Sequence, residues 1–365
     1  MAPNSDITTN HETPPPEREI FSFFRTKRFW LVLFIGQILA LCNTGSSTFA
    51  KLLSDNGTSI PAIQNIFVYI LLCLVYTPYT LYEYGFRKYV QMLSKEGWKY
   101  FILAFLDVEG NYFVVLALRY TTILSVQLIG FWAIVVVVII SFLALKVRYH
   151  WAQVSGILVA CGGMGLLMAS DHIHLGSSVT DGGSNELKGD LFMLLGATFY
   201  GFGNVTEEFL VSKRPLYEVV GQLGLWGIVI NGVQAAIFDR DQLQSAVWNE
   251  EIGGYIVGFT LCLFTFYTIA PILFRMSSAA FFNISLLTGN FWALLIGLKV
   301  FKYTIMWLYG VAFTCIVMGL VIYYVLTDVL GESKKPWLGE NQEKGVEGVG
   351  TAKREISKKA QDVEA

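Results

Sequence analysis

The sequence predicts an all-α protein that crosses a membrane many times, and composition and hydropathy both support this prediction. The chain has 365 residues, of which 54% are hydrophobic and only 15% are charged. A soluble domain carries about 25% charged residues, so the deficit favours a membrane protein. Apolar stretches recur along the chain and are centred near residues 40, 71, 107, 133, 159, 200, 227, 262, 288 and 316. We therefore expect a polytopic protein with ten transmembrane helices.

The distribution of Lys and Arg supports this division and predicts an orientation. With a cytosolic N-terminus and ten crossings, 20 of these residues fall on the cytosolic side and 6 on the other. Cytoplasmic loops are usually the richer in Lys and Arg, so we expect both termini in the cytosol. The sequence is compatible with the plasma membrane and with Golgi or vacuolar membranes.

The fifth and tenth spans resemble each other and predict an internal repeat. Residues 156–166 and 310–320 share Gly, Cys and Met positions at a constant offset of 154. Five spans per half is an odd number, so the second copy would be inverted, as in many secondary transporters. Chance similarity between spans rich in small residues is the alternative. The expected segments are a disordered cytoplasmic N-terminus (1–28), a first five-helix repeat (29–170), a non-cytoplasmic loop (171–187), a second repeat (188–330) and a disordered cytoplasmic tail (331–365).

Carboxylates deep in the third span are the strongest pointer to function. Counted from Trp98 at about 1.5 Å per residue, Glu109 lies about 16 Å into the span, near the midplane of a hydrocarbon core about 30 Å thick. A carboxylate there costs about 2.5–3.5 kcal/mol, so it implies water, a partner or a ligand. Asp107 and Asn111 share a helix face, whereas Glu109 points elsewhere. We expect Glu109 or Asn111 to face a cavity; a buried acid tied to a neighbouring helix is the alternative.

The sixth span contains a second polar stripe. Asn204, Glu207 and Glu208 lie close to one face of the expected helix. Glu208 is only five residues from Lys213, near the expected cytosolic interface. This pair is expected to form a gate, and the stripe is otherwise expected to contact substrate.

Further polar side chains are spread over the spans of both halves. Amides in membrane helices often join neighbouring helices, at about 0.6–2 kcal/mol each, and this is the alternative role for each of them. Tyr112 neighbours these stripes and is suited to stacking on a planar base. The remaining expected substrate-binding residues are Gln37, Asn43, Thr44, Gln64, Gln127, Asn283, Thr288 and Asn290.

Four strings in the expected spans resemble a known family. They are Asp107–Tyr112, Thr121–Leu128, Asn204–Glu208 and Leu286–Trp292. They are similar to subfamily F of solute carrier family 35, in the drug/metabolite transporter superfamily, and the resemblance runs from about residue 30 to 327. It implies the drug/metabolite transporter fold, with ten helices in two inverted halves working by alternating access. For the closest branch it implies queuine or queuosine as substrate. The chain differs from the family at Gly130 and Asn290, where Asp is usual.

Several functions compete at this level. The leading hypothesis is a carrier for a small planar polar solute such as a nucleobase or nucleoside. A nucleotide-sugar exchanger needs Lys or Arg in its cavity to meet phosphate, and Lys51 and Arg275 are the candidates. A non-transporting receptor or assembly factor is a third possibility. All four His lie outside the spans and no HExxH or GxSxG string occurs, so enzyme activity is not expected.

The expected partners are a small-molecule substrate and the lipid bilayer. The glycine-rich fifth and tenth spans suit close helix packing and allow a homodimer. No basic patch stands out among the spans, so nucleic acid is not expected. The five Cys lie in expected spans without metal-binding spacing, and neither a metal nor another cofactor is expected.

Overall fold

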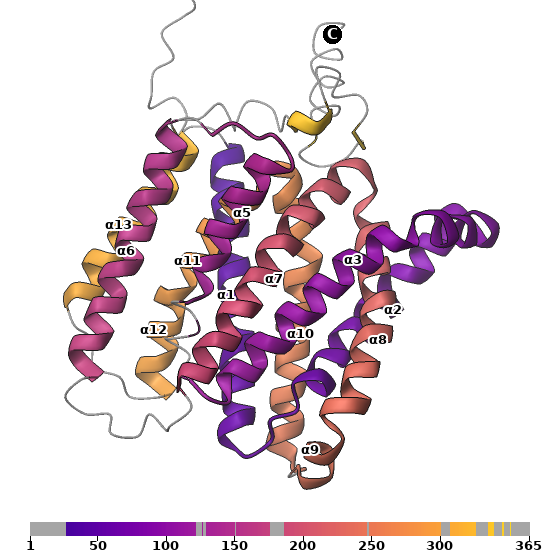
Figure 1. The fold of residues 1–365 in the computed structure, drawn as a ribbon, viewed down its shortest axis with the longest axis horizontal. Coiled ribbons are helices and arrows are strands. Elements are labelled where there is room, and N and C mark those ends of the chain that lie inside the picture. The colour runs from indigo at the N-terminus through magenta and orange to yellow at the C-terminus, as the bar shows by residue number, and fades with distance from the viewer. Residues whose placement is uncertain are drawn as a thin grey trace, which may run out of the picture.

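The computed structural model is helical throughout its described regular elements (Figure 1). It describes residues 27–121, 126, 129–149, 151–175, 186–246, 248–300, 307–325, 335–338, 345–346 and 351. The helices are α1 (Lys27–Asp55), α2 (Pro61–Tyr84), α3 (Phe86–Leu118), α5 (Trp132–Leu143), α6 (Trp151–Leu175), α7 (Glu186–Lys213), α8 (Leu216–Phe238), α9 (Arg240–Ser245), α10 (Glu250–Met276), α11 (Ala279–Leu287), α12 (Gly289–Val300) and α13 (Trp307–Val325), followed by the 3₁₀ turn η3 (Pro336–Leu338).

Five of the described helices are long and apolar enough to cross a membrane. They are α1 from Trp30, α2, α3, α8 and α10. At a rise of about 1.5 Å per residue, each exceeds the roughly 30 Å hydrocarbon core. Apolar side chains such as Trp30, Phe34 and Leu74 remain exposed on the bundle, as a lipid-facing surface requires. These features identify a multi-pass membrane protein.

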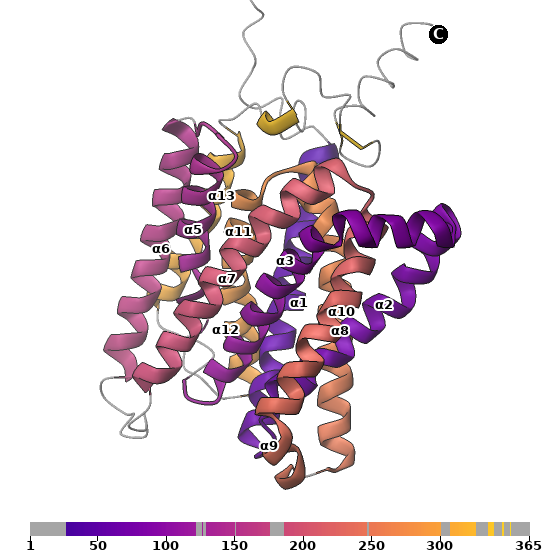
Figure 2. The same cartoon turned by 45° about the vertical axis from the view of Figure 1, so that its right-hand side comes forward.

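The helices pack in pairs that join distant parts of the chain (Figure 2). On one flank α6 lies along α13, and on the other α2 lies along α8. Between the flanks, α3 packs against α7 and α1 packs against α10. Further contacts join α5 to α7 and α1 to α11 and α12. The central helices therefore come from both ends of the sequence.

Glycines allow the close pairing of α6 with α13. A Cβ added at Gly319 would lie 2.6 Å from both the backbone nitrogen of Ala160 and the carbonyl oxygen of Gly156. A Cβ added at Gly156 would lie 2.6 Å from the backbone nitrogen of Tyr323. Any side chain at these positions would push the helices apart, so these glycines are used for packing within the chain.

The ninth expected span is divided into two short helices, which corrects the expectation of one continuous helix. α11 ends at Leu287 and α12 begins at Gly289, and Thr288 lies between them. The hydroxyl of Thr44 on α1 donates a hydrogen bond to the carbonyl of Gly289 at 3.0 Å. This bond joins α1 to the first residue of α12, next to the break.

The structure also refines the expected ends and loops. α6 continues to Leu175, so the helix extends into the segment expected to be a loop from 171. Residues 1–26 and 176–185, including most of the expected N-terminal and loop disorder, lie outside the described residues. In the expected disordered tail, Lys335 and Leu338 are buried against the bundle. Residues 335–338 of this expected tail therefore pack against the helices in the structure.

Candidate functional site

A cavity lies between the central helices of the bundle. Its empty volume is about 1120 Å³, part of which is continuous with the outside. On α1 the lining runs from Asn43 to Ala50, and on α3 from Asp107 to Leu118, the last residue of that helix. On α7 and α10 the lining continues to Glu207 and Tyr267, so the cavity extends from near the ends of α1 and α3 past the middle of α7 and α10. Polar lining comes from Asn43, Ser46, Ser47, Asp107, Asn111, Tyr200, Asn204, Glu207, Tyr267, Asn283 and Asn290.

Asp107 is the centre of a hydrogen-bond network that joins four helices. Its carboxyl accepts from the hydroxyl of Tyr69 on α2 at 2.8 Å and from that of Tyr267 on α10 at 2.8 Å. Asn111, one turn along α3, donates its amide to the same carboxyl at 3.2 Å. A buried carboxylate is costly unless it is hydrogen-bonded, and these three donors meet that requirement.

Asn111 extends the network to a further helix. Its side-chain carbonyl accepts from the hydroxyl of Tyr200 on α7 at 2.9 Å. Its side-chain NH₂ also donates to the hydroxyls of Tyr267 at 2.5 Å and Tyr69 at 3.1 Å. The network therefore fixes α2, α3, α7 and α10 around one end of the cavity.

Glu207 is a second carboxylate on the cavity wall, and its surroundings differ from those of Asp107. It lies on α7 and is only 8% exposed. Within the described part of the chain, no side chain or backbone group donates a hydrogen bond to it. Three residues earlier on α7, the amide of Asn204 donates to the carbonyl of Asn283 on α11 at 3.1 Å. Glu207 thus presents to the cavity a carboxylate that accepts no hydrogen bond from the described residues.

The lining residues that the structure describes include no Lys, Arg or His. Lys51 is paired with Asp55 at 3.0 Å and donates to the carbonyl of Leu118, a residue at the edge of the lining. Arg275 donates to the carbonyl groups of Val211 at 2.8 Å and Arg214 at 2.7 Å. Neither of the two candidate cations is among the lining residues. The site therefore combines carboxylates, amides, hydroxyls and aromatic rings.

The structure brings about half of the sequence-predicted site residues into the cavity. Asn43, Asn111, Asn204, Glu207, Asn283 and Asn290 line it. Gln37 instead donates to the hydroxyl of Thr288 at 2.9 Å and accepts from Trp292 at 3.2 Å. Together with the Thr44 bond to Gly289, these contacts join α1 to α11 and α12. Gln64 is buried on α2 outside the lining, and Gln127 lies outside the described residues.

The structure places Glu109 and Tyr112, which were expected to bind substrate, in a feature separate from the cavity. Both line a shallow groove between α3 and α8. Glu109 accepts a hydrogen bond from Gln234 on α8 at 2.7 Å. Residues two apart on a helix point in different directions, so placing Asp107 in the cavity turns Glu109 away from it.

Glu208 and Lys213, the residues expected to form a gate, have different partners in this structure. Lys213 lies over the ring of Phe209, 4.0 Å from its centroid. Glu208 is paired with Lys335 instead, at 2.6 Å, and accepts from the backbone nitrogen of Ala279 at 2.9 Å. Glu208 points toward the junction of α10 and α11, whereas Lys213 lies at the exposed end of α7.

Sequence reasoning missed four important residues, Asp107, Tyr69, Tyr200 and Tyr267. For Asp107 a signal existed, because its spacing of four from Asn111 places both on one face. For the three tyrosines no such signal existed, because each hydroxyl meets the network only through tertiary packing. Aromatic residues are too frequent in this sequence to single out three of them.

Comparisons with known proteins agree with this architecture. Residues 25–325 match the family model SLC35F, solute carrier family 35. The relative named "Uncharacterized solute carrier family 35 member C320.08" from Schizosaccharomyces pombe is 52% identical over 345 residues, which cover 94% of this chain and 66% of that protein. "Solute carrier family 35 member F2" from Mus musculus is 34% identical over 290 residues, or 79% of this chain and 77% of that protein. The same-named protein of Xenopus tropicalis is 34% identical over 310 residues, or 84% and 78%.

One solved structure supports the fold alone. It has a TM-score of 0.58 and 17% sequence identity, and the match covers 81% of this chain and 96% of that chain. Solute carrier family 35 proteins are transporters and not enzymes, which confirms the expectation that this chain is not an enzyme. The chain belongs to subfamily F of solute carrier family 35 and is a multi-pass membrane transporter.

Proposed function

We propose that this transporter carries a small planar polar solute, a nucleobase or nucleoside such as queuine or queuosine, by alternating access. The observation that carries the proposal is the chemistry of the cavity wall. Two carboxylates, five amides and several hydroxyls offer donors and acceptors, and no cation stands among the described lining residues. Nucleobases have both donor and acceptor edges, and their planar faces suit aromatic surfaces such as Phe131, Phe259 and Phe282 in the same wall.

The pairing of helices supports alternating access between two related halves. If α1, α2, α3, α5 and α6 correspond in order to α7, α8, α10, α11 with α12, and α13, the main contacts exchange with one another. The α3–α7 contact corresponds to α10–α1, and α5–α7 corresponds to α11 and α12 on α1. The α2–α8 and α6–α13 contacts correspond to themselves. This is the pattern expected of an inverted repeat with its site between the halves. We place both chain ends in the cytosol in this scheme.

A nucleotide-sugar exchanger is the alternative that this wall disfavours. Diphosphate carries negative charge that proteins usually meet with Arg or Lys. Here the carboxylates of Asp107 and Glu207 in the cavity wall would repel the diphosphate, and their burial would strengthen the repulsion.

Uptake measurements distinguish the two substrates. Cells or vesicles lacking this transporter, with and without the expressed chain, are given labelled queuine, labelled queuosine or a labelled nucleotide sugar. We expect the chain to add saturable uptake of queuine or queuosine that excess nucleotide sugar does not inhibit. Saturable uptake of a nucleotide sugar, without uptake of either queuine compound, would contradict the proposal.

Glu207 is expected to supply the hydrogen-bond acceptor that substrate uses. Glu207→Gln keeps the shape of the side chain but removes its charge. A hydrogen bond to a charged group is worth about 1.5–3 kcal/mol, so we expect the KM for uptake to rise about 10- to 100-fold. Thr206→Ser is the matched control on the same helix, because Thr206 is exposed and bonds only its own helix. An unchanged KM in the Glu207 variant, at normal protein abundance, would remove Glu207 from the binding site.

A further inference from the structure

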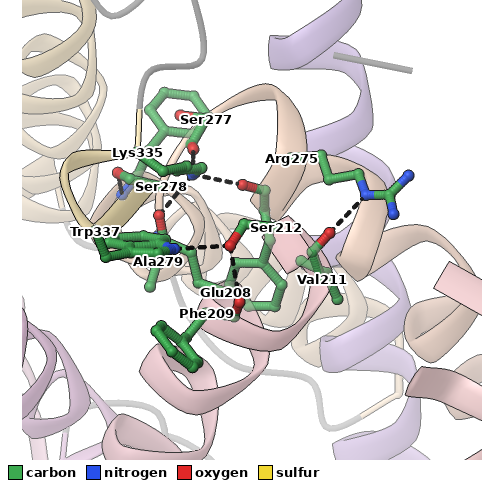
Figure 3. Close-up of polar contacts among 12 residues, drawn as sticks. Glu208, Phe209, Val211, Ser212, Arg275, Ser277, Ser278, Ala279, Lys335 and Trp337 are labelled. Atoms are coloured by element: carbon green, nitrogen blue, oxygen red, sulfur yellow. Dashed lines mark hydrogen bonds and ion pairs between the residues drawn. The ribbon is translucent and has the colours of Figure 1, made fainter. Parts of the chain in front are cut away.

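The C-terminal segment inserts a lysine between the end of α7 and the end of α10 (Figure 3). Lys335 lies just before η3 and is only 5% exposed. Its amine donates to Glu208 at 2.6 Å, to the carbonyl of Phe274 at 2.8 Å and to that of Ser277 at 2.5 Å. A lysine ammonium has three donors, and all three are used here. A buried charge so completely paired is a specific contact, and it comes from a segment outside the transmembrane helices.

The neighbouring residues hold the same segment in place. The indole nitrogen of Trp337 donates to the hydroxyl of Ser212 at 2.7 Å. The Trp337 ring packs against that of Phe209, with centroids 6.0 Å apart. Leu338 is buried, and farther along the chain the backbone nitrogen of Val346 donates to the carbonyl of Ser212 at 3.2 Å. Every one of these partners lies in the last turns of α7.

The segment joins elements that must separate if this end of the bundle is to open. Glu208 belongs to α7, whereas Phe274 and Ser277 lie at the end of α10 and just beyond it. Glu208 also accepts from the first backbone nitrogen of α11, at Ala279. Lys335 therefore bridges α7 to the α10–α11 corner, and any movement of α7 away from that corner leaves at least one buried charge without its partner.

The position of the cavity indicates which end of the bundle the Lys335 contact would keep closed. Cavity lining on α7 ends at Glu207 and lining on α10 ends at Tyr267. Beyond these residues lie the buried side chains of Glu208, Arg275, Lys335 and Leu338. The bridge thus stabilises the state in which the cavity is closed at the end where α7 and α10 terminate.

We propose that residues 335–338 form a latch. The latch must lose its contacts with α7 and with the junction of α10 and α11 before the cavity opens at the end where α7 and α10 terminate. The proposal goes beyond the transported solute and rests on the two-state cycle proposed above. It assigns to the C-terminal segment the control of one of the two openings. Whatever displaces the segment would favour the state open at that end.

The test uses a cysteine in the cavity and needs no substrate. The five native cysteines (Cys42, Cys73, Cys161, Cys262 and Cys315) are replaced by alanine, and Ser47→Cys is introduced in the cavity wall. Membrane-impermeant thiol reagent is applied from each side of sealed vesicles. In Lys335→Met we expect labelling from the latch side to rise about tenfold and labelling from the other side to fall, because the population shifts toward the state open at the latch end. Glu208→Gln should behave alike.

Lys213→Met is the matched control, since it removes an equal charge from the same end, and the described contact of Lys213 is with the ring of Phe209 and not with residues 335–338. Its labelling should equal that of the parent protein. The proposal is overturned if Lys335→Met and Glu208→Gln label like the parent, or if labelling rises equally from both sides, which would indicate a disordered bundle.

Amine footprinting provides a second readout that does not depend on the introduced cysteine. In the full chain in vesicles open to reagent, Lys335 should be acetylated much more slowly than the exposed Lys213. Glu208→Gln should remove this protection while leaving Lys213 unchanged. Equal acetylation of Lys335 and Lys213 in the unaltered protein would also overturn the proposal.

Discussion

Asp107→Asn is expected to reduce uptake at least tenfold. The carboxyl of Asp107 accepts hydrogen bonds from Tyr69, Tyr267 and Asn111. An amide at this position places its NH₂ group against these hydrogen-bond donors, or one of the donor side chains must rotate away. Each buried donor left without a partner costs about 1–3 kcal/mol. The network holds four helices around the cavity, so we expect both transport and thermal stability to fall.

Glu109→Gln is the control for this change. It makes the same acid-to-amide substitution two residues away on the same helix. Glu109 faces the groove between α3 and α8, where its single described hydrogen bond is from Gln234. We expect near-normal uptake and abundance. The measurement is uptake normalised to protein in the membrane, and the reverse ranking of the two variants would contradict the assignment of the cavity.

Gly319→Leu is expected to cause the largest loss of stability. A Cβ at this position would lie 2.6 Å from backbone atoms of Gly156 and Ala160, which a change of rotamer cannot relieve. Overpacking typically costs about 1–3 kcal/mol, and contact with backbone places this site at the upper end. We expect α6 and α13 to separate, with low abundance in the membrane and a clearly lower thermal midpoint of the purified protein.

Gly310→Leu provides the comparison within the same helix. Nothing lies within 4 Å of a Cβ added at Gly310. Leucine also favours helix over glycine, so this variant should be as stable as the parent or slightly more so. Equal destabilisation by the two substitutions would show that the close packing of α6 on α13 is not what Gly319 provides.

Most of the fold's outline could be predicted because bilayer thickness constrains the length of apolar segments. Centres from 40 to 262 each fall inside a described helix, and 316 falls inside α13. The exception is the ninth span, divided at Thr288. The residue that bonds next to this break, Thr44, is about 245 residues away in sequence, so local hydropathy gave no sign of the break. The buried Lys335 was also missed, since a polar tail is ordinarily solvated and this lysine depends on tertiary acceptors.

The sequence predicted the kinds of side chain in the candidate site more accurately than the individual residues. Spacing placed Asn204 and Glu207 in one stripe, and both line the cavity. Depth in the membrane favoured Glu109 over Asp107, yet depth does not determine which way a side chain points. The rotation of α3 is set by its contacts with α7 and α8, and these contacts are tertiary. Gln37, Thr44 and Thr288 illustrate the same limit, because amides and hydroxyls that join helices have the same sequence signal as those that face a cavity.

Equilibrium binding of labelled queuine to the purified transporter tests the central claim most directly. The parent, Glu207→Gln and Glu109→Gln are compared, each with and without excess nucleotide sugar. We predict saturable binding by the parent and by Glu109→Gln, at least about tenfold weaker binding by Glu207→Gln, and no displacement by the nucleotide sugar. Binding that survives in Glu207→Gln but is lost in Glu109→Gln, or that the nucleotide sugar displaces, would contradict the account.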